Sequence, residues 1–318
     1  MMNQNKDGFV WALDWNLLRT FMVVVEKGGI TLAANYLGVK QPTISNAITR
    51  LEKSVGCKLL ERRPNHFRIR AMGRRLHAEC NSLFGSISQL PGILTDKDDG
   101  VTGHISAAMA SQVVSPHFDE VLETFNKQYP NITYSIEIDK SIDVANRVRQ
   151  NRVTFGICLL HNSEPKLDSN VLYREFFGLF CGPRHKLFGK KEIKLSQIQG
   201  EDSVAFTPDI ETGPLYYLSQ LRERASLKQQ IKGVSTNLPE LRRMIIANIG
   251  IGSLPIHVAK RDVEAGEIWQ LPPYSRLPAV DVYLLTNPAR SFSPAETIFI
   301  GMLKALIHNI PIKDRTYY

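Results

Sequence analysis

Five polar side chains, Thr43, Asn46, Thr49, Arg50 and Lys53, fall between the apolar members of a helical repeat. They are therefore expected to share the exposed face of one helix. An Asn amide can bond adenine at two atoms, a Thr methyl can contact thymine, and Arg and Lys can bind phosphates. This face favours double-stranded DNA as its partner, although the solvated face of an ordinary three-helix bundle would carry similar residues.

The helix that carries this face is predicted to begin at Gln41–Pro42, because proline costs nothing in a first turn. Its buried side has apolar residues at helical spacing, namely Ile44, Ile48, Leu51 and Val55. Before it, an amphipathic helix is predicted to end near residues 28–29, and a short helix over 32–37 to end at Gly38. Two helices, a glycine turn and a polar-faced third helix make a helix-turn-helix.

A basic hairpin is predicted over residues 58–70, with its turn at 64–65. Arg68 and Arg70 alternate with apolar neighbours, so one face of the second strand is basic. Such a wing can reach phosphates or the adjacent minor groove. The predicted DNA-binding residues are Lys40, Gln41, Pro42, Thr43, Ser45, Asn46, Thr49, Arg50, Lys53, Arg62, Arg63, Arg68 and Arg70.

After the hairpin, apolar residues recur at alternating steps of three and four, as in a heptad seam. The repeat comprises Leu76, Cys80, Leu83, Ile87, Leu90 and Leu94. The pattern favours pairing of two chains through Leu76, Leu83, Ile87 and Leu90, while packing within one chain remains the alternative. A dimer would suit a helix-turn-helix, since such proteins usually read two half-sites.

The charge distribution agrees with a nucleic-acid partner. Of a net charge of +8, residues 1–95 supply +7, with 13 Lys and Arg against 6 Asp and Glu. We find neither a long apolar span nor a clear signal peptide, so we expect a cytoplasmic protein with no membrane partner. The four cysteines form no C-x-x-C pair. Reduced, buried thiols are expected, and a redox switch between Cys158 and Cys181 stays open.

Signatures of catalysis and metal binding are missing from the sequence. It contains no G-x-S-x-G, H-E-x-x-H or G-x-x-x-x-G-K-[ST] run, and its eight histidines show no metal-ligand spacing. We therefore predict no enzyme activity, no metal and no cofactor.

The remaining two-thirds alternates short apolar runs with helical segments. Strands are predicted near residues 134–138, 155–160, 177–181 and 280–285, with helices over 115–128 and 239–247. This alternation predicts an α/β fold with mostly parallel sheets.

Taken together, these motifs resemble those of the LysR-type transcriptional regulators. The resemblance is carried by Ala33-Ala34, Leu37, Gln41-Pro42-Thr43-Ile44-Ser45, Ile48, Leu51-Glu52 and Gly56-x-x-Leu59-Leu60-Glu61-Arg62. It extends more loosely to Tyr129-Pro130, Pro183-x-His185-x-Leu187 and Gly250-Ile251-Gly252-x-x-Leu254-Pro255. Arg70 and Ala71 replace the Thr and Glu that the family often has after the wing.

The resemblance implies an α/β protein with three parts. These are a winged helix-turn-helix over 1–72, a linker helix over 73–95 and an effector-binding domain over 96–318. Within the last, it implies subdomain I at about 101–173 and 271–310 and subdomain II at about 174–270, similar to periplasmic solute-binding proteins.

A small-molecule effector is then expected in the cleft between the subdomains, where the carboxyl ends of the strands meet. The implied effector-binding residues are Ser111, Gln112, Ser141, Phe206, Thr207, Ile251 and Gly252. Ser111 is expected to start a helix after the first strand, where free N–H groups favour an anionic group. The resemblance also implies a homotetramer acting on promoter or operator DNA, with RNA polymerase open as a further partner. The alternative is a constitutive DNA binder whose C-terminal domain only assembles oligomers.

Overall fold

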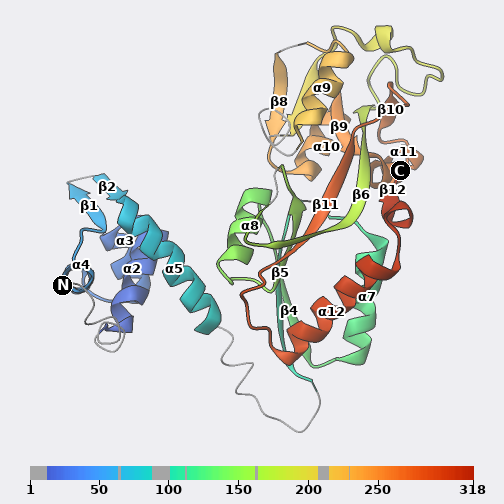
Figure 1. Cartoon of the computed structure of the whole chain (residues 1–318). Helices are drawn as coiled ribbons and strands as arrows, with labels where there is room; N and C mark the ends of the chain where they lie inside the picture. Colours follow the sequence, from blue (N-terminus) through green and yellow to red (C-terminus); the bar gives the residue numbers. More distant parts are fainter. Residues whose placement is uncertain are drawn as a thin grey trace. The chain divides into compact units, whose positions relative to one another are not determined.

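The computed structural model describes residues 13–63, 66–87, 101–111, 113–161, 164–206, 215–228 and 230–318. The chain forms two structural units, the first within residues 1–91 and the second made of nearly all the rest (Figure 1). Among the described helices, none is both long and apolar enough to cross a membrane.

The first unit is a three-helix core followed by a hairpin and a long helix. As predicted, the first two helices end at Gly28 and Gly38, which both adopt the left-handed conformation that glycine permits. The helix after Lys40 begins with proline in its first turn, also as predicted. The elements are α2 (Trp15–Lys27), α3 (Ile30–Leu37), α4 (Gln41–Val55), β1 (Leu60–Arg63), β2 (His66–Ile69) and α5 (Ala71–Ile87).

One apolar cluster holds the first unit together. Phe21, Ile48 and Leu51 are fully buried at its centre, and side chains of α5 also reach it. The close approach of α5 to the base of the hairpin requires Gly73. A Cβ there would lie 2.3 Å from the carbonyl oxygen of Leu59.

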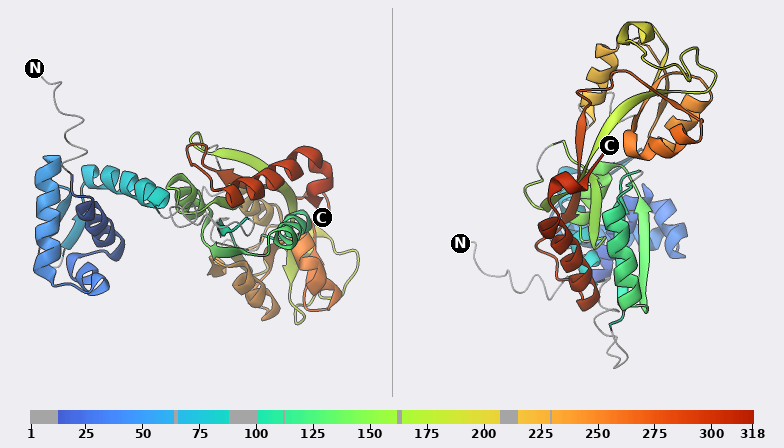
Figure 2. Two further views of the ribbon diagram at one scale, coloured as in Figure 1. Left: turned by 90° about the horizontal axis from the view of Figure 1, so that it is seen from below. Right: turned by 90° about the vertical axis from the view of Figure 1, so that its right-hand side faces the viewer.

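Subdomain I of the second unit has a sheet with helices on both faces, as Figure 1 shows. Alternate residues of the strands pack into two apolar cores, one on each face of the sheet. Ala107 and Ile157 pack toward α7 and α12, while Ala108 and Cys158 pack toward α8. Figure 2 shows α7 and α12 side by side on their face. The elements are β3 (Gly103–Met109), α7 (Pro116–Gln128), β4 (Ile132–Ile138), α8 (Ser141–Arg149), β5 (Phe155–Leu159) and α12 (Pro294–Asn309).

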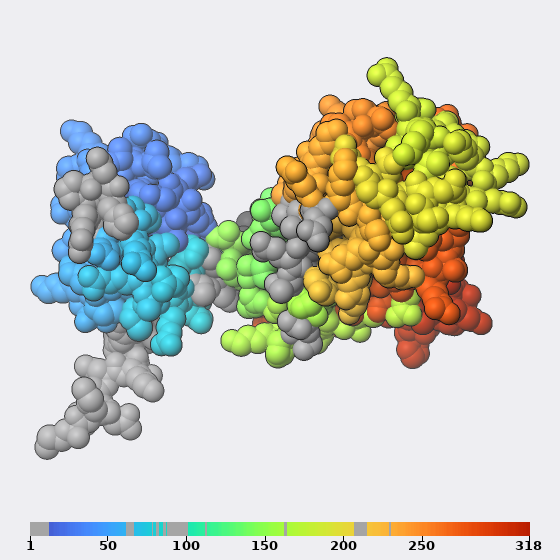
Figure 3. Space-filling view, turned by 90° about the horizontal axis from the view of Figure 1, so that it is seen from above, coloured from blue at the N-terminus to red at the C-terminus, as the bar shows by residue number. Residues whose placement is uncertain are grey.

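Subdomain II is also built of strands and helices. Its segments form one continuous body, coloured yellow to orange in Figure 3. Two apolar clusters fill it, and Leu241 and Ile251 lie fully buried in them. The elements are β7 (Ser203–Phe206), α9 (Tyr216–Arg224), β8 (Ile231–Ser235), α10 (Leu238–Ile246), β9 (Gly252–Pro255), α11 (Ile256–Glu264) and β10 (Trp269–Leu271), with a 3-10 turn at Leu195–Ile198.

Two long strands join the subdomains, β6 (Asp168–Cys181) and β11 (Ala279–Thr286). They pair antiparallel with each other, and β6 continues into antiparallel pairs with β9 and β10. The chain thus passes into subdomain II on β6 and returns on β11. A 3-10 turn (Ile312–Arg315) and β12 (Thr316–Tyr317) then close the chain against β6.

The expectation of mostly parallel sheets is wrong for this central region. Parallel pairing holds for β3 with β4 and β5, and for β7 with β8. Strand β11 is antiparallel to both β5 and β6, since it carries the returning chain. A single-sequence pattern of buried strands gives no strand direction, which is why the prediction failed there.

Candidate nucleic-acid interface and effector cavity

Helix α4 presents the predicted polar face to solvent. Its stripe of Ile44, Ile48 and Leu51 is buried, which turns the intervening positions outward. Lys40 is the N-cap residue and is exposed, while Ser45 is half-buried. The exposed members of the predicted set on this helix are Gln41, Pro42, Thr43, Asn46, Thr49, Arg50 and Lys53.

Arg50 already has an acidic partner in this structure. Its guanidinium lies 3.4 Å from the carboxylate of Asp14, and the Arg50 side chain is 68% exposed. Asp14 also caps α2 by accepting a hydrogen bond from the N–H of Asn16. An ion pair this exposed contributes little stability, so Arg50 can exchange Asp14 for a phosphate or a base.

The wing is held against α4 by the buried carboxylate of Glu52, which the sequence shows only as part of the Leu51-Glu52 run. Glu52 accepts hydrogen bonds from the N–H groups of Leu59 and Leu60, at 2.9 and 3.3 Å. Its second oxygen bonds the ammonium of Lys58 at 2.8 Å. Glu52 therefore fixes the position of the hairpin relative to α4.

The predicted basic residues occupy the hairpin as expected. Arg68 is exposed on β2, opposite Glu61 in the register, and Arg70 is exposed just after the strand. Arg62 and Arg63 lie on β1, and their side chains belong to the part of the chain that is not described. An exposed basic hairpin beside a polar-faced helix is suited to contact the DNA backbone.

The predicted heptad seam of α5 divides into two parts. Leu76 and Cys80 pack into the core of their own unit, and Cys80 is fully buried. Leu76 is half-buried against this core, so a partner contact there stays a prediction. Leu83 and Ile87 are each 40% exposed and remain available to a partner. Leu90 lies outside the described residues.

A cavity of about 310 Å³ lies where five parallel strands of the two subdomains end. Ser111 follows β3, Lys140 follows β4, Leu159 ends β5, Phe206 ends β7 and Thr236 follows β8. In open α/β folds this is the edge at which ligands bind. The cavity wall is mainly apolar with a few polar groups, which is typical of small-molecule sites.

Three of the implied effector-binding residues, Ser111, Ser141 and Phe206, line this cavity. The Ser111 hydroxyl accepts a hydrogen bond from the N–H of Leu238 at 3.4 Å, and so links subdomain I to α10. Ser141 accepts one from the N–H of Leu159 at 3.3 Å. Gln112 and Thr207 lie outside the described residues.

The structure corrects the other expectations for this site. Ile251 is fully buried in a core cluster and bonds the backbone of Asp202. Gly252 packs against Ile245, where a Cβ would lie 2.7 Å from the Ile245 side chain. Both serve close packing, and neither lines the cavity. Ser111 does not start a helix, because α7 begins at Pro116 and its N-cap is Ser115.

Several cavity residues were missed, above all those of β6. Tyr173, Glu175 and Phe177 project from alternate positions of that strand into the cavity wall. Glu175 is 5% exposed, and burial raises the pKa of its carboxyl to about 8. The signal in the sequence was a glutamate that alternates with two aromatic residues just before the strand predicted at 177–181, which in the structure begins at Asp168.

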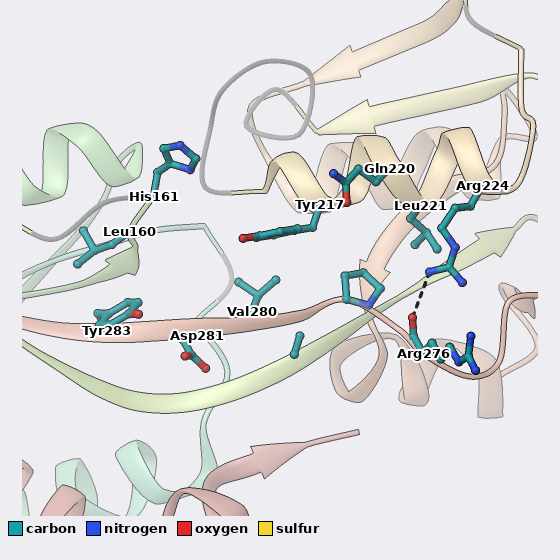
Figure 4. A pocket seen from close by; sticks show the side chains of 12 residues that line it. Leu160, His161, Tyr217, Gln220, Leu221, Arg224, Arg276, Val280, Asp281 and Tyr283 are labelled. Atoms are coloured by element: carbon teal, nitrogen blue, oxygen red, sulfur yellow. Dashed lines mark hydrogen bonds between the residues drawn. The ribbon is translucent and has the colours of Figure 1, made fainter.

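A second, more open cavity of about 530 Å³ lies beside β11 (Figure 4). Asp281 and Tyr283 line it, while Val282 between them lines the first cavity. Two of its polar side chains have partners: Arg224 donates to the carbonyl of Arg276 at 3.3 Å, and Asp281 accepts from two nitrogens of Arg174. Of the implied effector-binding residues that the structure describes, none lines this cavity.

The cysteines give no support to a redox switch. Cys158 and Cys181 belong to separate cores, and burial raises the pKa of each thiol to about 12. A thiol that stays protonated is a poor nucleophile. The described residues also contain no cluster of side chains suited to a metal ion.

Two protein-family models match the chain. Residues 15–74 match the bacterial regulatory helix-turn-helix protein model of the lysR family, and residues 98–307 match the LysR substrate binding domain. The HTH-type transcriptional regulator CysL of Bacillus subtilis is 25% identical over 291 residues, covering 92% of this chain and 97% of that protein.

Solved structures share the fold along nearly the whole chain. A full-length OxyR variant from Pseudomonas aeruginosa has a TM-score of 0.60 at 17% identity, covering 94% of this chain and 96% of that one. CbnR, a LysR family transcriptional regulator, has a TM-score of 0.65 at 17% identity, covering 93% and 99%. A structure of CbnR with its target DNA has a TM-score of 0.63 at 18% identity, covering 92% and 100%. The chain belongs to the LysR family of DNA-binding transcription regulators, with an N-terminal helix-turn-helix and a C-terminal effector-binding domain, and is not an enzyme.

Proposed function

We propose that this regulator binds an operator through α4 and the wing, and that a small molecule in the 310 Å³ cavity changes its affinity for that DNA. The observation that carries the proposal is the composition of the cavity wall. Residues of both subdomains line it, and the Ser111–Leu238 hydrogen bond spans them. A ligand that fills the cavity contacts both subdomains and so favours one arrangement of the two subdomains over others.

The proposed assembly is a homodimer or homotetramer. Leu83 and Ile87 on α5 support pairing of two chains, because both are exposed apolar residues one turn apart. Paired helix-turn-helix units would read two half-sites. We place the protein in the cytoplasm, where it acts on promoter DNA beside RNA polymerase.

The test is a fluorescence anisotropy titration of the full chain on its operator, repeated across a metabolite library. We expect at least one compound to change the dissociation constant for DNA by about 5- to 150-fold, the usual range of allosteric coupling. Thr236→Trp should fill the cavity from an exposed position, keep DNA binding and abolish this change.

Glu240→Trp is the matched control, since Glu240 lies on the exposed side of α10 and does not line the cavity. It should respond as the unaltered protein does. A response that survives in Thr236→Trp would show that the effector binds elsewhere. A library with no active compound would argue for the constitutive DNA binder.

A further inference from the structure

Glu175 is a buried carboxyl in the wall of the effector cavity. It lies on β6 between Tyr173 and Phe177, and its side chain is only 6% exposed. Its Oε2 has no hydrogen-bond partner among the described residues. Burying a carboxyl without a partner costs free energy, so an unsatisfied group of this kind needs a physical explanation, of which a bound ligand or ion is one.

His257 on α11 lies close to Glu175 but does not supply a donor. Its Nε2 lies 3.2 Å from the carbonyl oxygen of Val114, which can only accept, so Nε2 carries the hydrogen. Burial lowers the pKa of His257, and the neutral ring then has a bare Nδ1 that also lacks a partner among the described atoms. Nε2 lies 3.9 Å from Oε2 of Glu175. That separation is beyond hydrogen-bond distance, so His257 leaves this oxygen of Glu175 without a donor.

No cation from the surrounding elements neutralises Glu175 within the described residues. Tyr173 on β6 and Tyr317 on β12 are uncharged, and the Tyr317 hydroxyl bonds Ser115 and His117. Two further charged residues line the cavity. Asp139 lies 2.8 Å from the Arg147 guanidinium, and Lys140 is exposed to solvent.

We propose that the effector carries a protonated amine, which binds inside the cavity as an ion pair with Glu175. The inference rests on the proposed function and names the chemical class of its effector. An ammonium brings a positive charge and N–H donors to acceptors that have none. The apolar wall, including Phe177, Leu238 and Val282, suits a hydrocarbon body, and about 310 Å³ limits the effector to a small amine.

The proposal predicts a particular dependence of affinity on pH. Burial raises the pKa of Glu175 to about 8, so at neutral pH the empty cavity holds a mostly protonated carboxyl. An ammonium binds the ionised form and releases that proton. Affinity should therefore rise about tenfold per pH unit up to about pH 8, then level off while the amine remains protonated.

The test uses isothermal titration of the full chain with shape-matched probes: 2-phenylethylamine, 2-phenylethanol and 3-phenylpropionate, with butylamine and hexylamine as smaller amines. The amines should bind about tenfold or more tightly than the alcohol and the carboxylate. Glu175→Gln, which keeps the shape and removes the charge, should lose that preference and the pH dependence. Glu120→Gln, at an exposed position of α7, should change neither.

Equal binding of the alcohol or carboxylate would overturn the proposal, as would unchanged amine affinity in Glu175→Gln or no amine binding at all. The pH profile of the unaltered chain tests the idea even if a variant folds poorly. Failure of the proposed function has a different signature. If amines bind through Glu175 but no compound changes the affinity for DNA, the amine site is supported and its coupling to DNA binding is contradicted. If an effector without an amine changes the affinity for DNA, the coupling is supported and the amine site is contradicted.

Discussion

Asn46 and Arg68 occupy exposed positions of different kinds, one near the start of α4 and one on β2 of the wing. The N-terminal part of a recognition helix enters the major groove, whereas a wing mainly contacts the backbone. The two residues should therefore contribute to DNA binding in different ways.

Changing Asn46 to Ala should cost about 1–3 kcal/mol of binding free energy on the operator and relax preference at one base position. Changing Arg68 to Ala should weaken all sequences about equally and lower the slope of log affinity against log salt by about one. Anisotropy titrations on operator and unrelated DNA at several salt concentrations measure both effects. If Asn46→Ala weakens operator and unrelated DNA by the same factor, α4 does not read bases at that residue.

Glu175 should also affect the stability of the second unit without any ligand. Its pKa is raised by burial to about 8, above the ordinary value of 4.5, so the folded protein holds this proton more tightly than the unfolded chain. The stability from that proton is fully present below about pH 4.5 and is lost as pH rises toward 8.

Denaturant unfolding of the full chain between pH 5 and 8 checks this prediction. The Glu175 contribution should lower the free energy of unfolding by about 1 kcal/mol per pH unit, and Glu175→Gln should remove that part of the decline. Parallel pH curves for the two proteins would mean that Glu175 ionises in the folded state as it does in water.

At the scale of elements, α5 illustrates what a repeat can predict. The heptad pattern correctly predicted a helix with an apolar stripe, because spacing alone decides which residues share a face. It did not predict that the stripe changes partner along its length. Leu76 and Cys80 pack on the helix-turn-helix core, while Leu83 and Ile87 remain exposed. That division depends on which other helices pack against each part of α5, and the spacing of apolar residues does not determine this.

Replacing Leu83 and Ile87 with Asp should separate paired chains, because two charges would be buried in the proposed seam. The positions are exposed within one chain, so folding should be unaffected. Sedimentation velocity should then report a smaller species than the unaltered protein. An unchanged assembly would exclude this part of α5 as the dimer contact.

The α4 and cavity predictions differed in accuracy for a physical reason. The polar face of α4 is set by local periodicity, and its five predicted members all lie where the spacing indicated. The cavity depends on which strand ends meet, so only Ser111, Ser141 and Phe206 of the described predictions line it. The ligand contact predicted at Gly252 is wrong, because its missing side chain makes room for Ile245.

At the scale of the whole molecule, the alternation of strands and helices predicted the α/β class but not the direction of the strands. The antiparallel pair of β6 and β11 joins the two subdomains and carries residues of the cavity wall, including Glu175 and Val282. A ligand beside these strands would contact both subdomains. That shared contact is the basis of its proposed effect on DNA binding.

A symmetric assembly of this chain should read DNA sequence through α4, and selection of bound duplexes from a random-sequence library tests this directly. The full chain and Asn46→Ala are each used for selection. The full chain should enrich one motif with two related half-sites, their centres separated by a multiple of about 10 base pairs. Asn46→Ala should lose preference at one position in each half-site. Selection without an enriched motif, or the same motif from both proteins, would contradict sequence reading by α4.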